Sequence, residues 1–183
     1  MKVAILNGEP SAGSAFDTYV HEVAERMRAS GHEVLTLELR DLAIKGCSGC
    51  WGCWVKTPGE CVNRDDSEHV CRAATHSDLV VLASPMVLGF TSALLKRVAD
   101  QMIPLVHPYL VIEGGEMHHL ARYRHRFRMG LLLGASPDTD VEDLEITEKM
   151  WSRMARNLKS RLVFTAVTDR PAREVAHELT TAA

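Results

Sequence analysis

The clearest strand in the sequence is Asp78-Leu79-Val80-Val81-Leu82-Ala83-Ser84, an apolar run bounded by polar residues. A strand with successive apolar residues is typically buried on both faces, as in a parallel sheet that helices cover. Shorter strand-like segments occur at 2–7, 33–39, 129–134 and 161–168, and amphipathic helical patterns lie between most of them. Strands that alternate with helices predict βαβ units with right-handed crossovers.

We therefore predict an α/β fold: a flavodoxin-like three-layer sandwich around a five-stranded parallel sheet of order 2-1-3-4-5. One domain is expected to cover residues 1–183, because no linker or repeat divides them. Residues of about 41–66 are expected to form an inserted, ordered loop, and about 169–183 a polar C-terminal tail. In this strand order, ligands bind beyond the carboxyl ends of strands 1 and 3.

The composition is ordinary for a globular protein, with 46% hydrophobic and 25% charged residues. A net charge of -3 argues against general electrostatic binding to nucleic acid or to acidic membranes. No apolar run reaches the ~20 residues that span a bilayer. Four of the five cysteines crowd into residues 47–61, which is unlike a secreted disulfide framework. We expect a cytoplasmic protein with no membrane partner.

The loop after the first strand, Asn7 to Ala15, offers a place for a phosphate. Free backbone N–H groups, the start of a helix and the hydroxyls of Ser11 and Ser14 would all face it. Ser14 stands where a P-loop has its lysine, so an NTPase is not expected. Glu9 would repel a phosphate, and an ordinary strand-to-helix turn is the alternative interpretation.

The loop after the third strand, Ser84 to Ser92, is apolar at the predicted mouth of the sheet. An exposed apolar loop is unfavourable unless something covers it. A flat aromatic ring would do so, and a partner subunit would do so equally well.

The strongest local signal is the spacing Cys47-x2-Cys50-x2-Cys53-x7-Cys61. Four thiolates on one loop can converge on an iron–sulfur cluster. Zinc also takes four thiolates, although structural zinc sites usually use two separated pairs. Free thiols in a redox-active or simply well-packed loop are the third interpretation. Cys71, on the next predicted helix, is expected to be a small core residue.

These loops together resemble the NADPH-dependent FMN reductase and iron–sulfur flavoprotein families of the flavodoxin-like superfamily. The resemblance covers about residues 1–105 and rests on Asn7-Gly8-x-Pro10, on the cysteine run followed by Asp65-Asp66, and on Ser84-Pro85 leading to Ser92. It implies FMN, with NAD(P)H as electron donor and a [4Fe-4S] cluster on the four cysteines. It also implies a homodimer or homotetramer. The FMN-binding residues that it implies are Ser11, Gly13, Ser14, Ala15 and Phe16 for the phosphate, Ser84, Pro85, Met86, Val87, Leu88 and Gly89 for the ring, and Gly134 and Ala135 for the third contact.

The predicted function is an FMN-dependent oxidoreductase that exchanges electrons with a small-molecule or protein partner, and no side chain is assigned as a catalytic acid or base. One alternative is a non-enzymatic electron carrier or cysteine-based redox sensor on the same fold. A second is a nucleic-acid-binding protein that uses the basic run Arg122 to Arg128, although such a run is more often a solvated edge or a subunit contact.

Overall fold

The computed structural model describes residues 1–183 and contains the predicted doubly wound sheet. Its parallel strands are β1 (Lys2–Asn7), β2 (Glu33–Glu38), β3 (Leu79–Val87), β7 (Arg128–Gly134) and β8 (Leu162–Val167). They are hydrogen-bonded in the order β2-β1-β3-β7-β8, which is the predicted order 2-1-3-4-5. The short strand β4 (Phe90–Thr91) adds an antiparallel pair to the end of β3, so the sheet has six strands.

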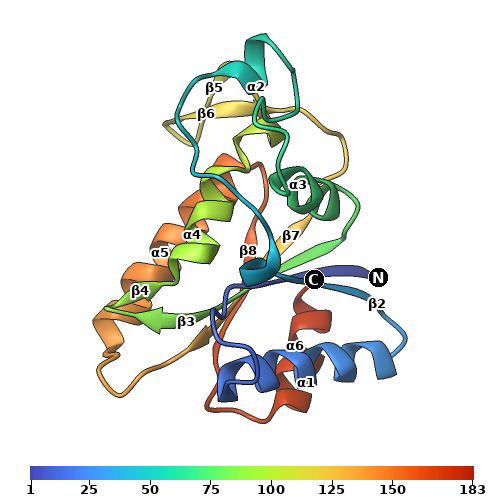
Figure 1. Cartoon of the computed structure of the whole chain (residues 1–183), viewed down its shortest axis with the longest axis vertical. Helices are drawn as coiled ribbons and strands as arrows, with labels where there is room; N and C mark the ends of the chain where they lie inside the picture. Colours follow the sequence, from blue (N-terminus) through green and yellow to red (C-terminus); the bar gives the residue numbers. More distant parts are fainter.

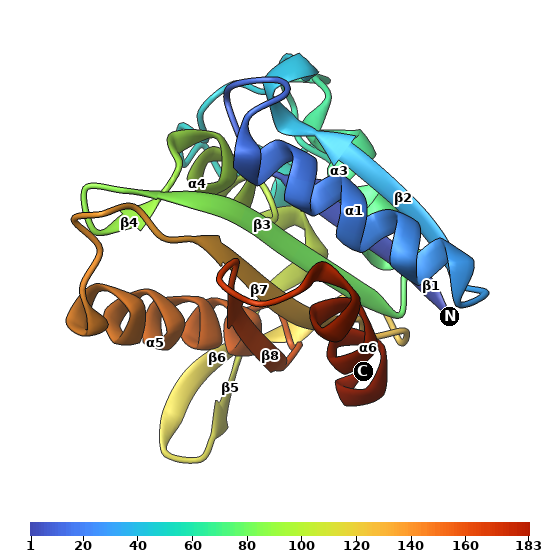
Figure 2. The ribbon, with the colours of Figure 1, turned by 90° about the horizontal axis from the view of Figure 1, so that it is seen from below.

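Two hydrophobic cores lie on opposite faces of this sheet. Helices α1 (Ala15–Ala29) and α6 (Ala172–Ala182) cover one face, while α3 (Ser67–Thr75), α4 (Ala93–Asp100) and α5 (Val141–Asn157) cover the other. Figure 1 shows the sheet between these two layers, and Figure 2 shows α1 running beside β1 and β2. Alternate residues of the central strands contribute to each core, as Leu82 and Val81 do. The three-layer sandwich is therefore confirmed.

Two segments differ from the sequence predictions. Residues 169–183 contain α6 rather than a polar tail, and its buried side chains Ala172, Val175, Ala176 and Leu179 follow the spacing of one helix face. That spacing is visible in the sequence, but the polar residues between these four positions obscured it. Residues 106–121, for which no element was predicted, form an antiparallel hairpin of β5 (Val106–Glu113) and β6 (Glu116–Ala121).

The hairpin extends from the end of the molecule that also holds the cysteine loop (Figure 1). That loop contains the short helix α2 (Gly52–Val55) and lies between η1 (Leu39–Asp41) and α3. The segment η2 (Ile103–Leu105) connects α4 to β5. None of the helices is both long and apolar enough to cross a lipid bilayer.

Candidate functional site

The turns that leave β1 and β3 meet at one mouth of the sheet. Gly8 N–H donates to Ala83 O at 2.8 Å, and Ser92 Oγ donates to Gly8 O at 2.7 Å. Ser92 N–H in turn donates to Ser84 Oγ at 2.8 Å, so one serine ties the two turns together. A Cβ on Gly8 would lie 2.9 Å from Ser92 Oγ, and this close approach explains the glycine.

The loop after β7 reaches the same mouth through Phe16. A Cβ on Gly134 would lie 2.5 Å from the Phe16 ring, so the ring packs directly on the Gly134 backbone. The Phe16, Ser84 and Met86 side chains and the Gly134 backbone are all buried, so they support the mouth rather than face solvent. Ser11, Gly13, Ala15 and Ala135 are exposed at its surface.

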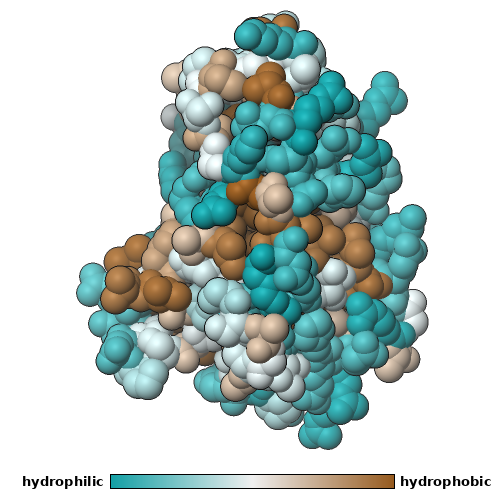
Figure 3. Space-filling view, in the orientation of Figure 1, coloured by the Kyte–Doolittle hydropathy of each residue, from teal (hydrophilic) through white to brown (hydrophobic).

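The β3–β4 turn gives the mouth an exposed apolar side. Val87 is 50% exposed and Leu88 is fully exposed, and Leu88 and Gly89 both have positive φ values, of 50° and 73°. Figure 3 shows hydrophobic atoms gathered where this turn extends from the molecule. Such a surface suits an aromatic ring, and the flavin-ring role of Ser84 to Gly89 stays a prediction.

In the phosphate loop, Gly8 to Ser14, and at the start of α1, some backbone N–H groups are free and others donate to side chains of the chain itself. Ala12, Ala15 and Phe16 N–H have no acceptor within the chain. Ser11 N–H donates to Glu9 Oε1 at 2.8 Å, and Gly13 N–H donates to Asp17 Oδ2 at 2.8 Å. The free N–H groups lie at the N-terminal end of the 15-residue α1 and can donate hydrogen bonds to an anion, so the loop fits the FMN phosphate in part.

A charged network lies beneath this loop. Arg40 Nη1 contacts Asp17 Oδ1 and Glu38 Oε2, each at 2.9 Å, and Asn7 Nδ2 donates to both carboxylates. Burial of Asp17 opposes its ionisation, but the hydrogen bonds from Gly13 N–H, Arg40 and Asn7 outweigh burial and lower its pKa. Asp17, His21 and Glu38 bring ligand atoms within 4.8 Å of one another, and Arg40 supplies the cation between the two carboxylates. No spacing or motif in the sequence indicated this network.

The four cysteines Cys47, Cys50, Cys53 and Cys61 line one cavity of about 320 Å³ beside the C-terminal end of α4. Cys53 is buried, Cys61 is half-buried, and Cys47 and Cys50 are exposed. All are free thiols. The backbone N–H of Gly52 and the Ser48 side chain lower the pKa of Cys50, whereas burial and the neighbouring Cys47 raise the pKa of Cys53.

The spread of these sulfur atoms is informative. Three thiolates around one zinc ion at 2.3 Å would lie about 3.8 Å apart. The chain's one set of three ligand atoms within 4.8 Å is Asp17, His21 and Glu38, so no three cysteine sulfurs are that close. The four thiols are the ligand set that either an iron–sulfur cluster or a zinc ion uses, and both would require the sulfur atoms to converge.

The cysteine loop is anchored at its base. Asp66 Oδ2 accepts from Ala43 N–H at 2.7 Å, Asp65 Oδ2 accepts from Lys45 N–H at 2.9 Å, and Gln101 Nε2 donates to Lys45 O at 2.6 Å. Trp54 stacks on Trp51 with ring centroids 4.9 Å apart. Its Nε1–H donates to Val106 O at 3.0 Å, which fixes the loop to the hairpin.

Cys71 is part of the packing, as expected. Burial raises the pKa of its thiol to about 12, and the group lies outside the cysteine cavity. Its Sγ–H donates weakly to Gln101 O at 3.6 Å.

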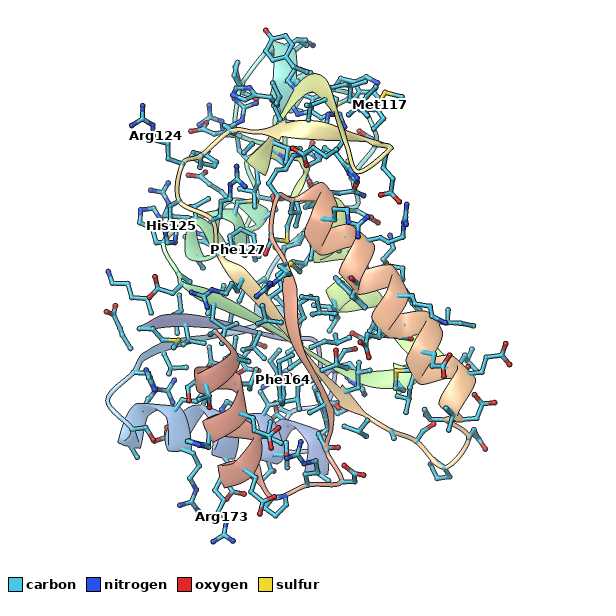
Figure 4. All side chains as sticks on the ribbon, turned by 180° about the vertical axis from the view of Figure 1, so that it is seen from behind. Met117, Arg124, His125, Phe127, Phe164 and Arg173 are labelled. Atoms are coloured by element: carbon cyan, nitrogen blue, oxygen red, sulfur yellow. The ribbon has the colours of Figure 1, made fainter.

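The basic run is partly structural. Arg122 Nε donates to Pro104 O at 2.9 Å, His125 Nε2 lies 2.7 Å from Ser77 O, and Phe127 is buried in the core. Figure 4 shows Arg124 pointing away from the molecule while Phe127 lies inside it. The run therefore connects β6 to β7 and is anchored at these three residues, while Arg124, Arg126 and Arg128 are exposed.

Comparison with known proteins agrees with this geometry. The chain is 33% identical over 107 residues to an iron–sulfur flavoprotein from Archaeoglobus fulgidus. The aligned segment covers 58% of this chain and 48% of that relative. The chain thus spans about half the length of the curated relatives it matches. A solved NAD(P)H:quinone oxidoreductase from Methanothermobacter marburgensis superposes with a TM-score of 0.64 and 18% identity, covering 100% of this chain and 95% of that one.

A second solved structure is similar in the same way. It is an FMN-dependent NADH-azoreductase from Bacillus anthracis in complex with FMN, with a TM-score of 0.63 and 14% identity, covering 100% of this chain and 98% of that one. At such identities these structures establish the flavodoxin-like fold. The sequence model of the family described as NADPH-dependent FMN reductase matches residues 1–132. The chain therefore belongs to the NADPH-dependent FMN reductase family.

Proposed function

We propose that this chain is an FMN-dependent oxidoreductase that takes electrons from NADH or NADPH and delivers them to a small-molecule or protein acceptor. The observation that carries this proposal is the meeting of the β1, β3 and β7 turns at one mouth. Family membership and the flavoenzymes with the same fold support it.

The chain's own groups divide the binding of FMN between them. Ala12, Ala15 and Phe16 N–H and the Ser11 hydroxyl would face the phosphate. Val87 and Leu88 would cover one face of the ring and exclude water from it. The backbone of Gly134 and Ala135 would close the third side. FMN, when bound, supplies both one-electron and two-electron chemistry.

We further propose that Cys47, Cys50, Cys53 and Cys61 hold a [4Fe-4S] cluster. Four free thiols around one cavity and the iron–sulfur flavoproteins among the relatives support this assignment. Trp51, which lines the cavity, would limit solvent access, and such a cover tunes the reduction potential of a metal centre.

The visible spectrum of anaerobically purified protein tests both proposals. Flavin bands, present on isolation or after FMN is added, together with NAD(P)H oxidation that depends on FMN, are the expected result. A broad brown absorption with bound iron is expected from the cysteine site. A colourless protein that takes up neither FMN nor iron would contradict both.

The two alternatives are not favoured. A non-enzymatic carrier or sensor would show no steady-state NAD(P)H turnover in the same assay, whereas the family and the flavoenzymes that share its fold point to turnover. Nucleic-acid binding lacks support because Arg122, His125 and Phe127 are engaged in the fold.

A homodimer or homotetramer remains our proposal for the assembly. The β5–β6 hairpin exposes Tyr109, Leu110 and Ile112, which are 66%, 55% and 78% exposed, and burying such side chains favours self-association. Light scattering during size-exclusion chromatography would measure the assembled mass. We also propose a cytoplasmic location, which agrees with five free thiols.

A further inference from the structure

The phosphate loop already contains two anions of its own. Glu9 Oε1 accepts from Ser11 N–H and Asp17 Oδ2 accepts from Gly13 N–H, both at 2.8 Å. Glu9 is 6% exposed and Asp17 is 4% exposed, so neither carboxylate is a mobile surface group. Backbone N–H groups in such a loop are the donors that a bound phosphate uses. Two of them are therefore closed to a ligand.

The charge around the loop also opposes a phosphate. Two carboxylates, Asp17 and Glu38, contact the guanidinium of Arg40, and the Glu9 carboxylate lies in the loop itself, where it accepts from Ser11 N–H. Arg40 divides its contacts between Asp17 and Glu38 and donates to the backbone O of Glu9 at 3.2 Å. Arg40 thus faces two carboxylates, which His21 Nε2 also approaches at 3.7 and 3.3 Å, while the Glu9 carboxylate has no salt bridge. A phosphate bound in the loop would add negative charge beside Glu9. Such repulsion is strongest from the Glu9 and Asp17 carboxylates, which are buried although residues 10–13 of the loop are exposed.

The opposite side of the mouth has no such penalty. Val87 and Leu88 present exposed apolar surface at the β3–β4 turn, and neither carries charge. Contacts with a flavin ring would be the same whether or not the ribityl chain ends in a phosphate. The two sides of the mouth therefore differ in how they respond to phosphorylation of the ligand.

We infer that Glu9 and Asp17 act as internal anions of the phosphate loop, so that the site selects a flavin by its ring and gains little from a 5′-phosphate. Riboflavin-type flavins are then ligands comparable to FMN. This inference rests on the proposed flavin function.

Fluorescence titration of the full-length protein with FMN and with riboflavin tests it. In the wild type the two dissociation constants should agree within about tenfold. Glu9→Gln keeps an acceptor oxygen for Ser11 N–H and removes the charge, so FMN should bind about tenfold or more tightly while riboflavin is unchanged. Glu22→Gln on the exposed face of α1, where the Glu22 side chain is 51% exposed, should change neither constant.

Ionic strength provides a second measurement that needs no variant. Salt screens repulsion, so raising it should tighten FMN binding to the wild type and leave riboflavin binding unchanged. A phosphate held by attraction would respond in the opposite way. If Glu9→Gln does not fold, Glu9→Ser removes the same anion and should tighten FMN binding likewise.

The outcomes separate this inference from the proposed function. FMN binding more than about a hundredfold tighter than riboflavin in the wild type, weakened by salt, would overturn the inference and leave the flavin function intact. Unchanged FMN affinity in a folded Glu9 variant would also overturn it. Failure of both flavins to bind the wild type and the variants would instead remove the proposed function.

Discussion

The phosphate loop and the cysteine loop are built in opposite ways. The phosphate loop satisfies part of its own backbone, with Glu9, Ser14 and Asp17 side chains accepting from N–H groups. In the cysteine loop, residues 46–50 form no backbone–backbone hydrogen bonds, and the Cys47 and Cys50 thiols are exposed. The first loop thus holds two of its N–H groups on its own carboxylates, while residues 46–50 of the second loop have no backbone hydrogen bond to hold them.

The two loops also lie at opposite ends of one helix. Ser92 caps α4 at the mouth of the sheet, and Asp100 at its other end lines the cysteine cavity. Eight helical residues span about 12 Å. Substitutions in one loop should therefore leave the structure of the other loop unchanged.

The largest effect is expected from Cys53→Ser, which alters the buried cysteine of the cavity. Iron content and brown absorption should fall more than tenfold because one of four ligands is lost. FMN affinity should not change, since the mouth of the sheet is not touched. Cys71→Ser, outside the cavity, is the matched control and should keep its iron. Equal iron in wild type and Cys53→Ser would show that the cysteines do not hold a cluster.

Arg40→Met tests how far the phosphate loop depends on its own charges. The change leaves the Asp17 and Glu38 side chains, 6% and 19% exposed, without their cation, and should lower the free energy of unfolding by about 3 kcal/mol. Urea denaturation measures this value. Arg26→Met on the exposed face of α1 should cost less than about 0.5 kcal/mol. Equal losses of unfolding free energy in Arg40→Met and Arg26→Met would show that the buried network stabilises the fold no more than an exposed ion pair does.

The pH dependence of stability should report the same network. The pKa of Asp17 is lower in the folded protein than its ordinary value of 3.8, so its stabilising contribution is present above about pH 4 and is lost as pH falls below it. Asp17→Asn should cost about 2 kcal/mol at pH 7. The difference between wild type and variant should shrink below about pH 4, as measured by urea denaturation at several pH values. A difference that stays constant across this range would exclude an ionised Asp17 as its source.

The smallest change in stability is expected from Leu88→Asn at the β3–β4 turn. The side chain is fully exposed and has a φ of 50°, a conformation that asparagine tolerates well, so the free energy of unfolding should stay within about 0.5 kcal/mol. Flavin affinity should fall severalfold because apolar surface at the mouth is lost. Unchanged affinity for both FMN and riboflavin would place the ring elsewhere.

Local patterns were sufficient to predict several features. Apolar runs such as 78–84 predicted the buried parallel strands, and their alternation with helices predicted the strand order. The cysteine spacing predicted four thiols at one place, and all four line one cavity. These features depend on residues close together in the chain, so their signal survives without knowledge of the fold.

Other features depended on contacts between distant segments. Pairing of β1 with β2 places Asn7 beside Glu38, and only then do Asp17 and Arg40 meet them. No local spacing links these residues, so their convergence beneath the phosphate loop was not visible in the sequence. The sequence alone determined the layered sheet, the two loops and the cysteine set. Tertiary structure decided which backbone donors remain free, because a carboxylate accepts hydrogen bonds from the groups that the fold places near it, whatever their separation along the chain.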